Sequence, residues 1–146
     1  MPSDSDEIEL EVADSVASVK EAAHLFDHPV DDGATRAFLD DRRHVLLVAR
    51  IGGHPVGFVS GVELTHPDKA RSEMFVYELG VDEDFRRRGI ATALMQGLIA
   101  LCETRGCGEM FVLTEHDNEA ALATYRKALG TPEPAGVMFT WHWTDR

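Results

Sequence analysis

Hydrophobic and polar positions follow two different periods along the chain, and together they predict six strands and four helices. Residues 8–12 alternate strictly between apolar and charged side chains, as is typical of a half-buried strand. Residues 90–105 place apolar side chains at helical spacing, and Gly106 follows where a left-handed helix end is expected. The other predicted strands are residues 44–51, 56–64, 74–81, 110–114 and 137–143, and the other predicted helices are residues 15–26, 34–41 and 118–129. This order predicts an α/β (α+β) fold, a mixed sheet with helices on both faces.

Length and charge narrow the class of protein. The 146 residues suit one compact domain, residues 1–146, in which residues 1–7 form a polar lead-in. The formal net charge is −12, half of it from six acidic residues among the first fourteen. An acidic surface repels nucleic acid and attracts polycations. Simple solubility explains the same charge equally well, so both explanations stay open.

The stretch between the strand at 74–81 and the helix at 90–105 is basic and contains a glycine. Arg86, Arg87 and Arg88 precede Gly89, and no capping side chain stands directly before the helix. Free backbone N–H groups, the positive end of the helix and guanidinium groups together attract an anion, most naturally a phosphate. Gly89 lets the backbone approach such a ligand closely. The sequence therefore predicts a phosphate-binding turn.

The same turn carries a resemblance to a known family. The spacing Arg86-x-x-Gly89-x-Ala91, after a strand and at the start of a helix, resembles the pyrophosphate loop of GNAT-superfamily N-acetyltransferases. Residues 118–130 are similar to the superfamily helix that carries a candidate general-acid tyrosine. Residues 70–79 and 87–94 look most like the aminoglycoside 3-N-acetyltransferases within that superfamily.

This resemblance implies a fold and a cofactor. The expected GNAT fold has a mixed central β-sheet of about six to seven strands, splayed at the cofactor site and flanked by about four helices. The expected cofactor is acetyl-coenzyme A. The implied cofactor contacts come from the central strand, the turn and the last helix, and they are Leu79, Val81, Arg86, Arg87, Arg88, Gly89, Ile90, Ala91, Thr92, Asn118 and Tyr125.

Acetyl transfer to an amine requires a neutral nitrogen and a proton donor for the departing thiolate. Glu78, a charged residue within an apolar strand, is the first candidate for the general base, and we expect burial to make it a stronger base. The resembled aminoglycoside enzymes carry Asp at this position. Alternatively, Glu78 pairs with an arginine or lies on the exposed face of its strand. His116 is the runner-up base, because an imidazole exchanges its proton near neutral pH.

Tyr125 is the candidate general acid. Its phenol can donate a proton or a hydrogen bond to the coenzyme sulfur. The alternative is a core aromatic on the apolar face of the helix at 118–129.

Acidic side chains around these residues suggest a cationic acceptor. The predicted substrate contacts are Glu73, Tyr77, Glu78, Glu115, His116 and Asp117. In the superfamily the acceptor site is also flanked by the region of Asp31, Asp32, Asp40 and Asp41. For each of these residues, a role as a solvated turn or cap residue is the favoured explanation.

Together with these residues, the resemblance implies an acetyl-coenzyme A-dependent aminoglycoside N-acetyltransferase acting on the 3-amino group, an antibiotic-resistance activity. The first alternative is the same chemistry on a protein N-terminus, a lysine or a polyamine. The second is a catalytically silent coenzyme-binding module.

Other features suggest no metal site and no membrane association. His24 and His28 have the spacing of a helical metal site, but Pro29 ends the helix and no third ligand follows. Cys102 and Cys107 are too few for a zinc site or a disulfide framework. No segment is long and apolar enough to span a membrane, and no signal peptide is recognisable, so we expect a cytoplasmic protein. The aromatic segment 137–143, with both tryptophans, predicts a homodimer.

Overall fold

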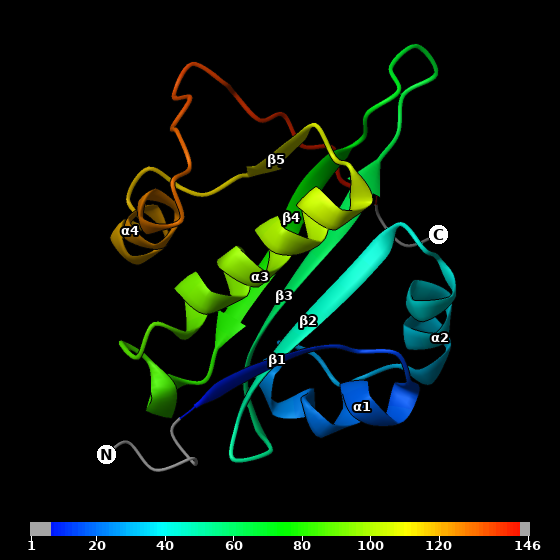
Figure 1. Cartoon of the computed structure of the whole chain (residues 1–146), viewed down its shortest axis with the longest axis vertical. Helices are drawn as coiled ribbons and strands as arrows, with labels where there is room; N and C mark the ends of the chain where they lie inside the picture. Colours follow the sequence, from blue (N-terminus) through cyan, green and yellow to red (C-terminus); the bar gives the residue numbers. More distant parts are fainter. Residues whose placement is uncertain (1–6, 144–146) are drawn as a thin grey trace.

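A meander of four antiparallel strands, extended by one parallel strand, forms the sheet of the protein (Figure 1). The strands lie in the order β1 (Ile8–Val12), β2 (His44–Ile51), β3 (His54–Leu64), β4 (Glu73–Val81) and β5 (Glu109–Val112). The computed structural model describes residues 7–143, so the predicted lead-in lies outside the described residues apart from Glu7. The predicted mixed sheet is confirmed, although the described residues form five strands rather than six or seven.

The helices cover both faces of this sheet (Figure 1). They are α1 (Val16–Glu21), α2 (Asp32–Asp40), α3 (Ile90–Arg105) and α4 (Glu119–Lys127), with two short 3₁₀ turns, η2 (Ala23–Leu25) and η3 (Glu83–Phe85). The helix predicted at residues 15–26 is divided in two. Its backbone tightens at Ala22, whose N–H donates to the carbonyl of Val19, three residues back, and the chain continues as η2.

Burial on both faces explains why β2 is apolar along nearly its whole length. Val45, Leu47 and Ala49 pack against α3, whereas Leu46 and Val48 pack in a second core beneath α1 and α2. A strand that is covered on both sides needs no polar alternation. On the α3 side, Leu94 and Leu98 are fully buried against the sheet.

The strand predicted at residues 137–143 is wrong. This segment is not a strand in the structure, and its large apolar side chains are 68 to 79% exposed. The alternating pattern favours a pleated surface, but a strand also needs a neighbouring backbone to pair with, and no described strand pairs with this segment. The predicted homodimer through this segment stays a prediction.

Among residues 7–143, no helix is both long and apolar enough to cross a lipid bilayer.

Candidate active site

The edge of β4 that faces β5 is only partly paired. The two strands run parallel from Glu73, opposite Glu109, to Val76, opposite Val112, and their pairing ends there. Beyond that point, residues 77–81 of β4 have no strand partner on this side among the described residues. The sheet therefore splays open beside the second half of β4, as predicted, and leaves backbone hydrogen-bonding groups for a ligand.

One extra residue in the same half of β4 distorts its other edge. Gly61 of β3 pairs with Val76, and the adjacent Ser60 pairs with Glu78, so that Tyr77 is the additional residue of a β-bulge. The Ser60 hydroxyl accepts a hydrogen bond of 3.2 Å from the N–H of Glu78. This contact fixes the backbone directly after the bulge.

The bulge determines the face on which Glu78 lies. Met74 and Val76 before the bulge, and Leu79 and Val81 after it, all pack against the α3 core. Side chains alternate along a regular strand, so without the extra residue Glu78 would point into that core. The structure instead leaves Glu78 exposed on the opposite face. The predicted burial of Glu78 is therefore wrong, and the alternative position on the exposed strand face is confirmed.

A cavity of about 290 Å³ opens at this position. Its lining consists of Leu25, Asp27, Phe58, Tyr77, Glu78, Leu79 and Gly80. Two carboxylates and two aromatic rings suit a protonated amine, which binds both to negative charge and to the face of a ring. Sequence reasoning missed Asp27, although it is the first acidic residue after η2, next to the region expected to flank the acceptor.

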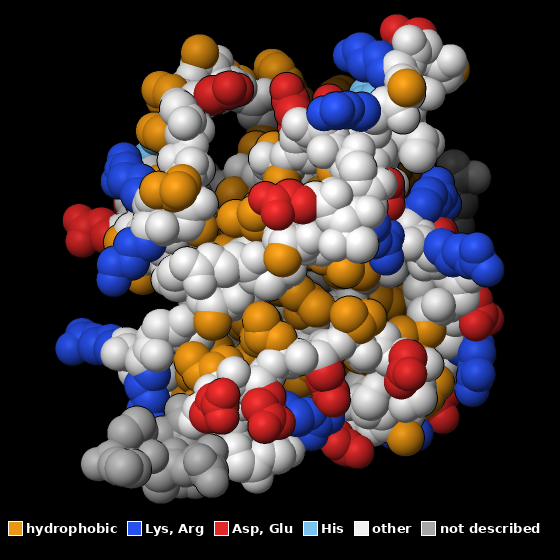
Figure 2. Space-filling model, viewed as in Figure 1, with side chains coloured by type: hydrophobic (Ala, Val, Ile, Leu, Met, Phe, Trp, Pro, Cys, Tyr) orange, Lys and Arg blue, Asp and Glu red, His pale blue; other side chains and the backbone are white. Residues whose placement is uncertain are grey.

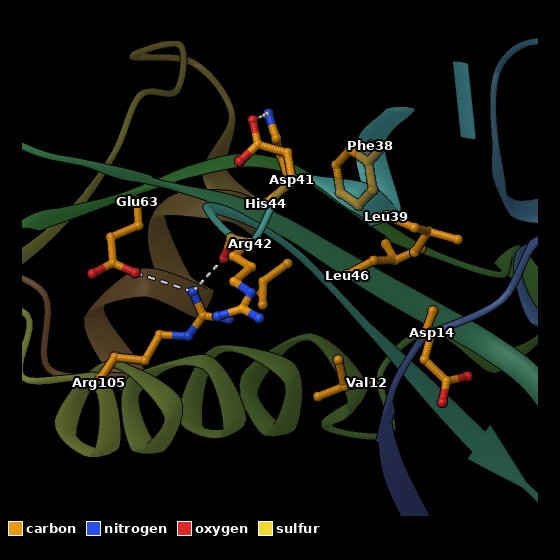
Figure 3. A pocket seen from close by; sticks show the side chains of 12 residues that line it. Val12, Asp14, Phe38, Leu39, Asp41, Arg42, His44, Leu46, Glu63 and Arg105 are labelled. Atoms are coloured by element: carbon orange, nitrogen blue, oxygen red, sulfur yellow. Dashed lines mark hydrogen bonds and ion pairs between the residues drawn. The ribbon is translucent and has the colours of Figure 1, made fainter. Parts of the chain in front are cut away.

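A larger cavity, of about 520 Å³, lies elsewhere. It opens beside Arg105, the last residue of α3, roughly 24 Å of helix away from the basic turn. Figure 3 shows the guanidinium of Arg105 donating to Glu63 and to the carbonyl of Arg42, both at 3.0 Å. Hydrogen bonds from Ser72 and Arg105 lower the pKa of Glu63, which keeps this ion pair charged. None of the predicted catalytic, cofactor or substrate-contact residues lines this cavity, and the one expected flanking residue that does, Asp41, is hydrogen-bonded to Arg43. The smaller cavity is therefore the candidate acceptor site.

The basic turn before α3 has the geometry of an anion site. Gly89, at the N-cap position, has a left-handed backbone with φ +77°, and no side chain caps the helix. The first intrahelical bond is donated by Ala93 to Gly89, so the N–H groups of residues 90–92 have no helical partner. Arg87 also has a positive φ, +66°, a conformation that few non-glycine residues adopt. Basic side chains protrude around this turn (Figure 2).

A comparison with protein families identifies the class of site formed by the uncapped helix start, the left-handed Gly89 and the nearby arginines. Residues 13–131 match the model of the acetyltransferase (GNAT) family. The chain belongs to the GNAT family. Members of this family use acetyl-coenzyme A, and that is the cofactor of this protein.

Three relatives illustrate the range of similar proteins. A protein named acetyltransferase from Pectobacterium atrosepticum is 39% identical over 83 residues, which are 57% of this chain and 55% of that protein. Mycothiol acetyltransferase from Clavibacter michiganensis is 36% identical over 108 residues, 69% of this chain and 34% of that protein. This chain thus spans about half or less of these curated relatives. An aminoglycoside acetyltransferase from an uncultured soil sample superposes with a TM-score of 0.83 at 27% identity, covering 94% of this chain and 99% of that one.

The uncapped GNAT turn fits the pyrophosphate of this cofactor. Its free N–H groups point out of the helix end, Gly89 presents no side chain, and a Cβ there would meet no protein atom within 4 Å. Arg88 lies over the ring of Phe85, with its guanidinium carbon 5.0 Å from the ring centroid. This contact holds one of the three arginines close to the turn.

Tyr125 and Asn118 both belong to α4 or its cap. Asn118 is the N-cap, and its side-chain oxygen accepts a 3.1 Å hydrogen bond from Ala121. The side-chain oxygen of Asn118 is thus used to cap the helix, and its NH₂ group remains available to donate a hydrogen bond to the coenzyme. Tyr125 is half-buried at the edge of the α3 core, and this burial raises the pKa of its phenol. Tyr125 therefore packs on the core and keeps a protonated hydroxyl, and its role as general acid stays a prediction.

The predicted acidic cluster is not assembled as one group. Glu73 lies at the start of β4, roughly 17 Å of strand from Glu78, and its carboxylate is 3.5 Å from His66. Residues 115–117 follow the end of β5 and lead into α4 (Figure 1). These three residues, Glu115, His116 and Asp117, are all exposed. Glu73 and residues 115–117 thus lie at opposite ends of β5.

Three of the four aspartates expected to flank the acceptor have structural partners. Asp31 caps α2, and Asp32 forms a 2.9 Å ion pair with Lys20. Hydrogen bonds from Arg43 lower the pKa of Asp41 from 3.8 to about 2. These contacts support the interpretation of Asp31, Asp32 and Asp41 as cap and turn residues.

We predict that Gly89→Ala weakens acetyl-coenzyme A binding by at least about tenfold, a free-energy loss of about 1.4 kcal/mol. The added methyl group projects into the space that the pyrophosphate must approach. Isothermal titration calorimetry on the folded variant measures the loss.

Gly106→Ala is the matched control for this substitution. Gly106 stands at the other end of α3, has φ +78° and likewise offers open space to a Cβ. Both variants should lose about 1–2 kcal/mol of stability through the left-handed backbone. Equal coenzyme affinity in the two variants would contradict the assignment of the turn.

Proposed function

We propose that this protein transfers the acetyl group of acetyl-coenzyme A to an amine of a polycationic small molecule, namely the 3-amino group of an aminoglycoside. The observation that carries this proposal is the placement of Asp27 and Glu78 in one cavity, at the point where β4 leaves β5. The cavity adjoins the half of β4 that leads directly to the anion-binding turn. An amine bound there lies beside the route of a coenzyme anchored at Gly89.

In this proposal Glu78 binds the acceptor ammonium and accepts its proton. A general base must lie within hydrogen-bond reach of the proton it removes, directly or through one water. The bulge at Tyr77 provides this reach, because it turns the Glu78 carboxylate out of the core and into the cavity. Exposure then allows the proton to pass on to solvent. Asp27 supplies a second negative charge for an acceptor with more than one ammonium group.

Backbone groups of β4 serve the coenzyme. The side chains of Leu79 and Val81 pack on the α3 core, so what these residues present at the open edge is their backbone. Amide groups there can hydrogen-bond the coenzyme arm as a strand would, and an N–H aimed at the thioester oxygen would stabilise the developing negative charge. The coenzyme supplies the activated acetyl group.

Tyr125 acts as the proton donor for the leaving thiolate. Its burial keeps the phenol protonated at neutral pH, the state that a general acid requires. The NH₂ group of Asn118 and the arginines of the turn bind the rest of the coenzyme.

The acceptor class has a second candidate. The match to a mycothiol acetyltransferase covers 69% of this chain at 36% identity, which is higher than the 27% identity to the aminoglycoside acetyltransferase of known structure. This match supports an amine related to mycothiol as the acceptor. The paired carboxylates and the net charge of −12 favour the polycation.

A thiol-release assay with several acceptors tests the proposed function. We expect gentamicin, sisomicin and kanamycin to release coenzyme A at least tenfold faster than spermidine, a lysine peptide or des-acetyl mycothiol, because only an aminoglycoside presents several rigidly spaced ammonium groups to both carboxylates. Mass spectrometry and NMR of the product identify the acetylated nitrogen. Turnover of des-acetyl mycothiol alone would replace the aminoglycoside with the second candidate, and no turnover with any amine would overturn the proposal.

Glu78→Gln is expected to lower kcat by roughly two to four orders of magnitude, the usual effect of removing a general base. Coenzyme affinity should stay unchanged, since the turn before α3 is intact. Glu73→Gln is the matched control, because it makes the same change on the same strand near His66 and should keep most of the activity. If Glu78→Gln turns over at the wild-type rate while His116→Ala does not, His116 is the base instead.

Tyr125→Phe is expected to lower kcat by about a hundredfold with little effect on coenzyme affinity, because the ring remains and only the proton donor is lost. Burial raises the pKa of Tyr125 above its ordinary value of 10.0, so the wild-type rate should be lost only as the pH rises beyond that value. The pH–rate profile should lose this alkaline limb in the variant. An unchanged alkaline limb would assign it to another group and remove Tyr125 from the proposed role.

A further inference from the structure

Two histidines and an aspartate from separate segments meet near the basic turn. His24 belongs to η2, His54 begins β3, and Asp82 follows β4. One ligand atom from each of the three lies within 4.8 Å of the other two. The segments that carry them lie at the same end of the sheet (Figure 1). The chain folds so that side chains nearly thirty residues apart in sequence form one cluster.

The contacts within the cluster hold it in place. The rings of His24 and His54 are stacked with their centroids 5.2 Å apart, and Nε2 of His24 is 3.8 Å from Oδ2 of Asp82. Nε2 of His24 also lies 2.9 Å from the carbonyl oxygen of Pro55. A metal-binding histidine commonly donates the N–H of its other ring nitrogen to such a carbonyl, so Nδ1 of His24 is the nitrogen left for an ion.

Asp82 has one oxygen available for a ligand. Its Oδ1 accepts a 3.0 Å hydrogen bond from the N–H of Asp84, whereas Oδ2 faces His24. The backbone N–H of Asp82 donates to Val56 at 2.8 Å and so fixes the carboxylate against β3. Glu83 and Asp84, the next two residues, add negative charge beside it.

We propose that His24, His54 and Asp82 bind a divalent transition-metal ion of the zinc class. Two imidazoles and one carboxylate are a donor set that such ions prefer, with water completing the coordination, whereas Mg²⁺ and Ca²⁺ prefer oxygen ligands. Tetrahedral zinc at its usual bond lengths needs ligand atoms roughly 3.3 Å apart. Both histidines are exposed, so small ring rotations from the stacked arrangement can bring the ligand atoms to this separation.

The sequence alone predicts no metal site, because His24 and His28, four residues apart, lack a third ligand nearby in the sequence. Partners for His24 come instead from segments that are distant in the sequence. The 3₁₀ turn and Pro29 leave His28 outside the cluster, and the fold brings His54 and Asp82 to His24 instead.

The cluster is linked by direct contacts to the coenzyme turn. His54 lies against the ring of Phe85, with centroids 6.2 Å apart, and the guanidinium of Arg88 lies over the same ring. Asp82 caps η3, the short turn that ends at Phe85 directly before Arg86. An ion bound by His24, His54 and Asp82 would therefore restrain the segment that carries the phosphate-binding arginines, and we infer that it strengthens coenzyme binding.

The test uses the full chain without an affinity tag. Titration with ZnCl₂, followed by calorimetry, should show one ion bound per chain, and MgCl₂ should show no binding. Titration with CoCl₂ should give the visible absorption of a nitrogen- and oxygen-ligated ion. His24→Gln, His54→Gln and Asp82→Asn should each weaken zinc binding by at least about a hundredfold. Asparagine at position 82 still caps η3, so this variant keeps the local fold.

His28→Gln is the matched control, because it removes an exposed imidazole four residues from His24 and should leave zinc affinity unchanged. Absence of zinc binding in the wild-type protein, or zinc binding that persists in all three cluster variants, would overturn the site.

The link to the coenzyme has a separate readout. Saturating zinc should tighten coenzyme A binding at least threefold in the wild-type protein and not in His24→Gln. By thermodynamic reciprocity, coenzyme A should tighten zinc binding by the same factor. Equal coenzyme affinity with and without zinc would overturn the coupling. Neither measurement depends on turnover or on the identity of the acceptor, so failure of the metal site and failure of the proposed function are distinguishable.

Discussion

The structure depends on the unequal pairing of β4 along its two edges. One edge is paired with β3 along the whole strand, whereas the other is paired with β5 only up to Val76. A fully paired β4 would leave no backbone group for a ligand, and a fully unpaired edge would expose the core. A buried backbone N–H or C=O group without a hydrogen-bond partner costs about 1–3 kcal/mol. Water or a ligand must therefore hydrogen-bond the backbone of the unpaired half of β4. The cofactor route is therefore a consequence of where two strands separate.

The bulge at Tyr77 makes that open half chemically useful. It reverses the alternation of side chains, so that Leu79 and Val81 still pack on α3 while Glu78 faces the cavity. Helix α3, which follows β4, likewise separates the part that binds a ligand from the part that stabilises the fold. Its first turn lacks a side-chain cap, worth about 1 kcal/mol, but its other end is closed by hydrogen bonds from Gly106 and Cys107. Leu94 and Leu98 anchor its middle in the core. Stability is thus concentrated away from the end that binds phosphate.

Much of this architecture could be predicted from the sequence, because local patterns encode it. The order of elements through α4 and the uncapped turn at Gly89 follow from periodicity and missing caps. The bulge was also encoded: the buried residues Met74 and Val76 occupy even positions, and Leu79 and Val81 occupy odd ones. One extra residue between Val76 and Leu79 is the only way to keep all four on one face.

The rest could not be predicted, because it depends on which segments become neighbours. The aromatic segment 137–143 has the composition of a strand, but composition does not supply a partner. Asp27 acquires its position from the way η2 follows α1 over the sheet, and His54 reaches His24 only through the β2–β3 turn. Pairings between distant segments carry no signal in a single sequence. The same holds for Glu73, whose separation from Glu115 follows from the parallel register of β4 and β5.

The exposure of Glu78 changes how the proposed chemistry must work. A buried carboxylate would be a stronger base, but it would have to receive a charged ammonium in a poorly solvated site, which costs several kcal/mol unless the pair is well matched. An exposed carboxylate avoids that cost and hands its proton to water. A single exposed carboxylate, however, binds any ammonium group only weakly, so it cannot by itself discriminate between acceptors. Asp27, in the same cavity, addresses this difficulty, because two separated carboxylates discriminate in favour of acceptors whose ammonium groups have a matching spacing. The open geometry of this site therefore favours a rigid polycation over a simple amine.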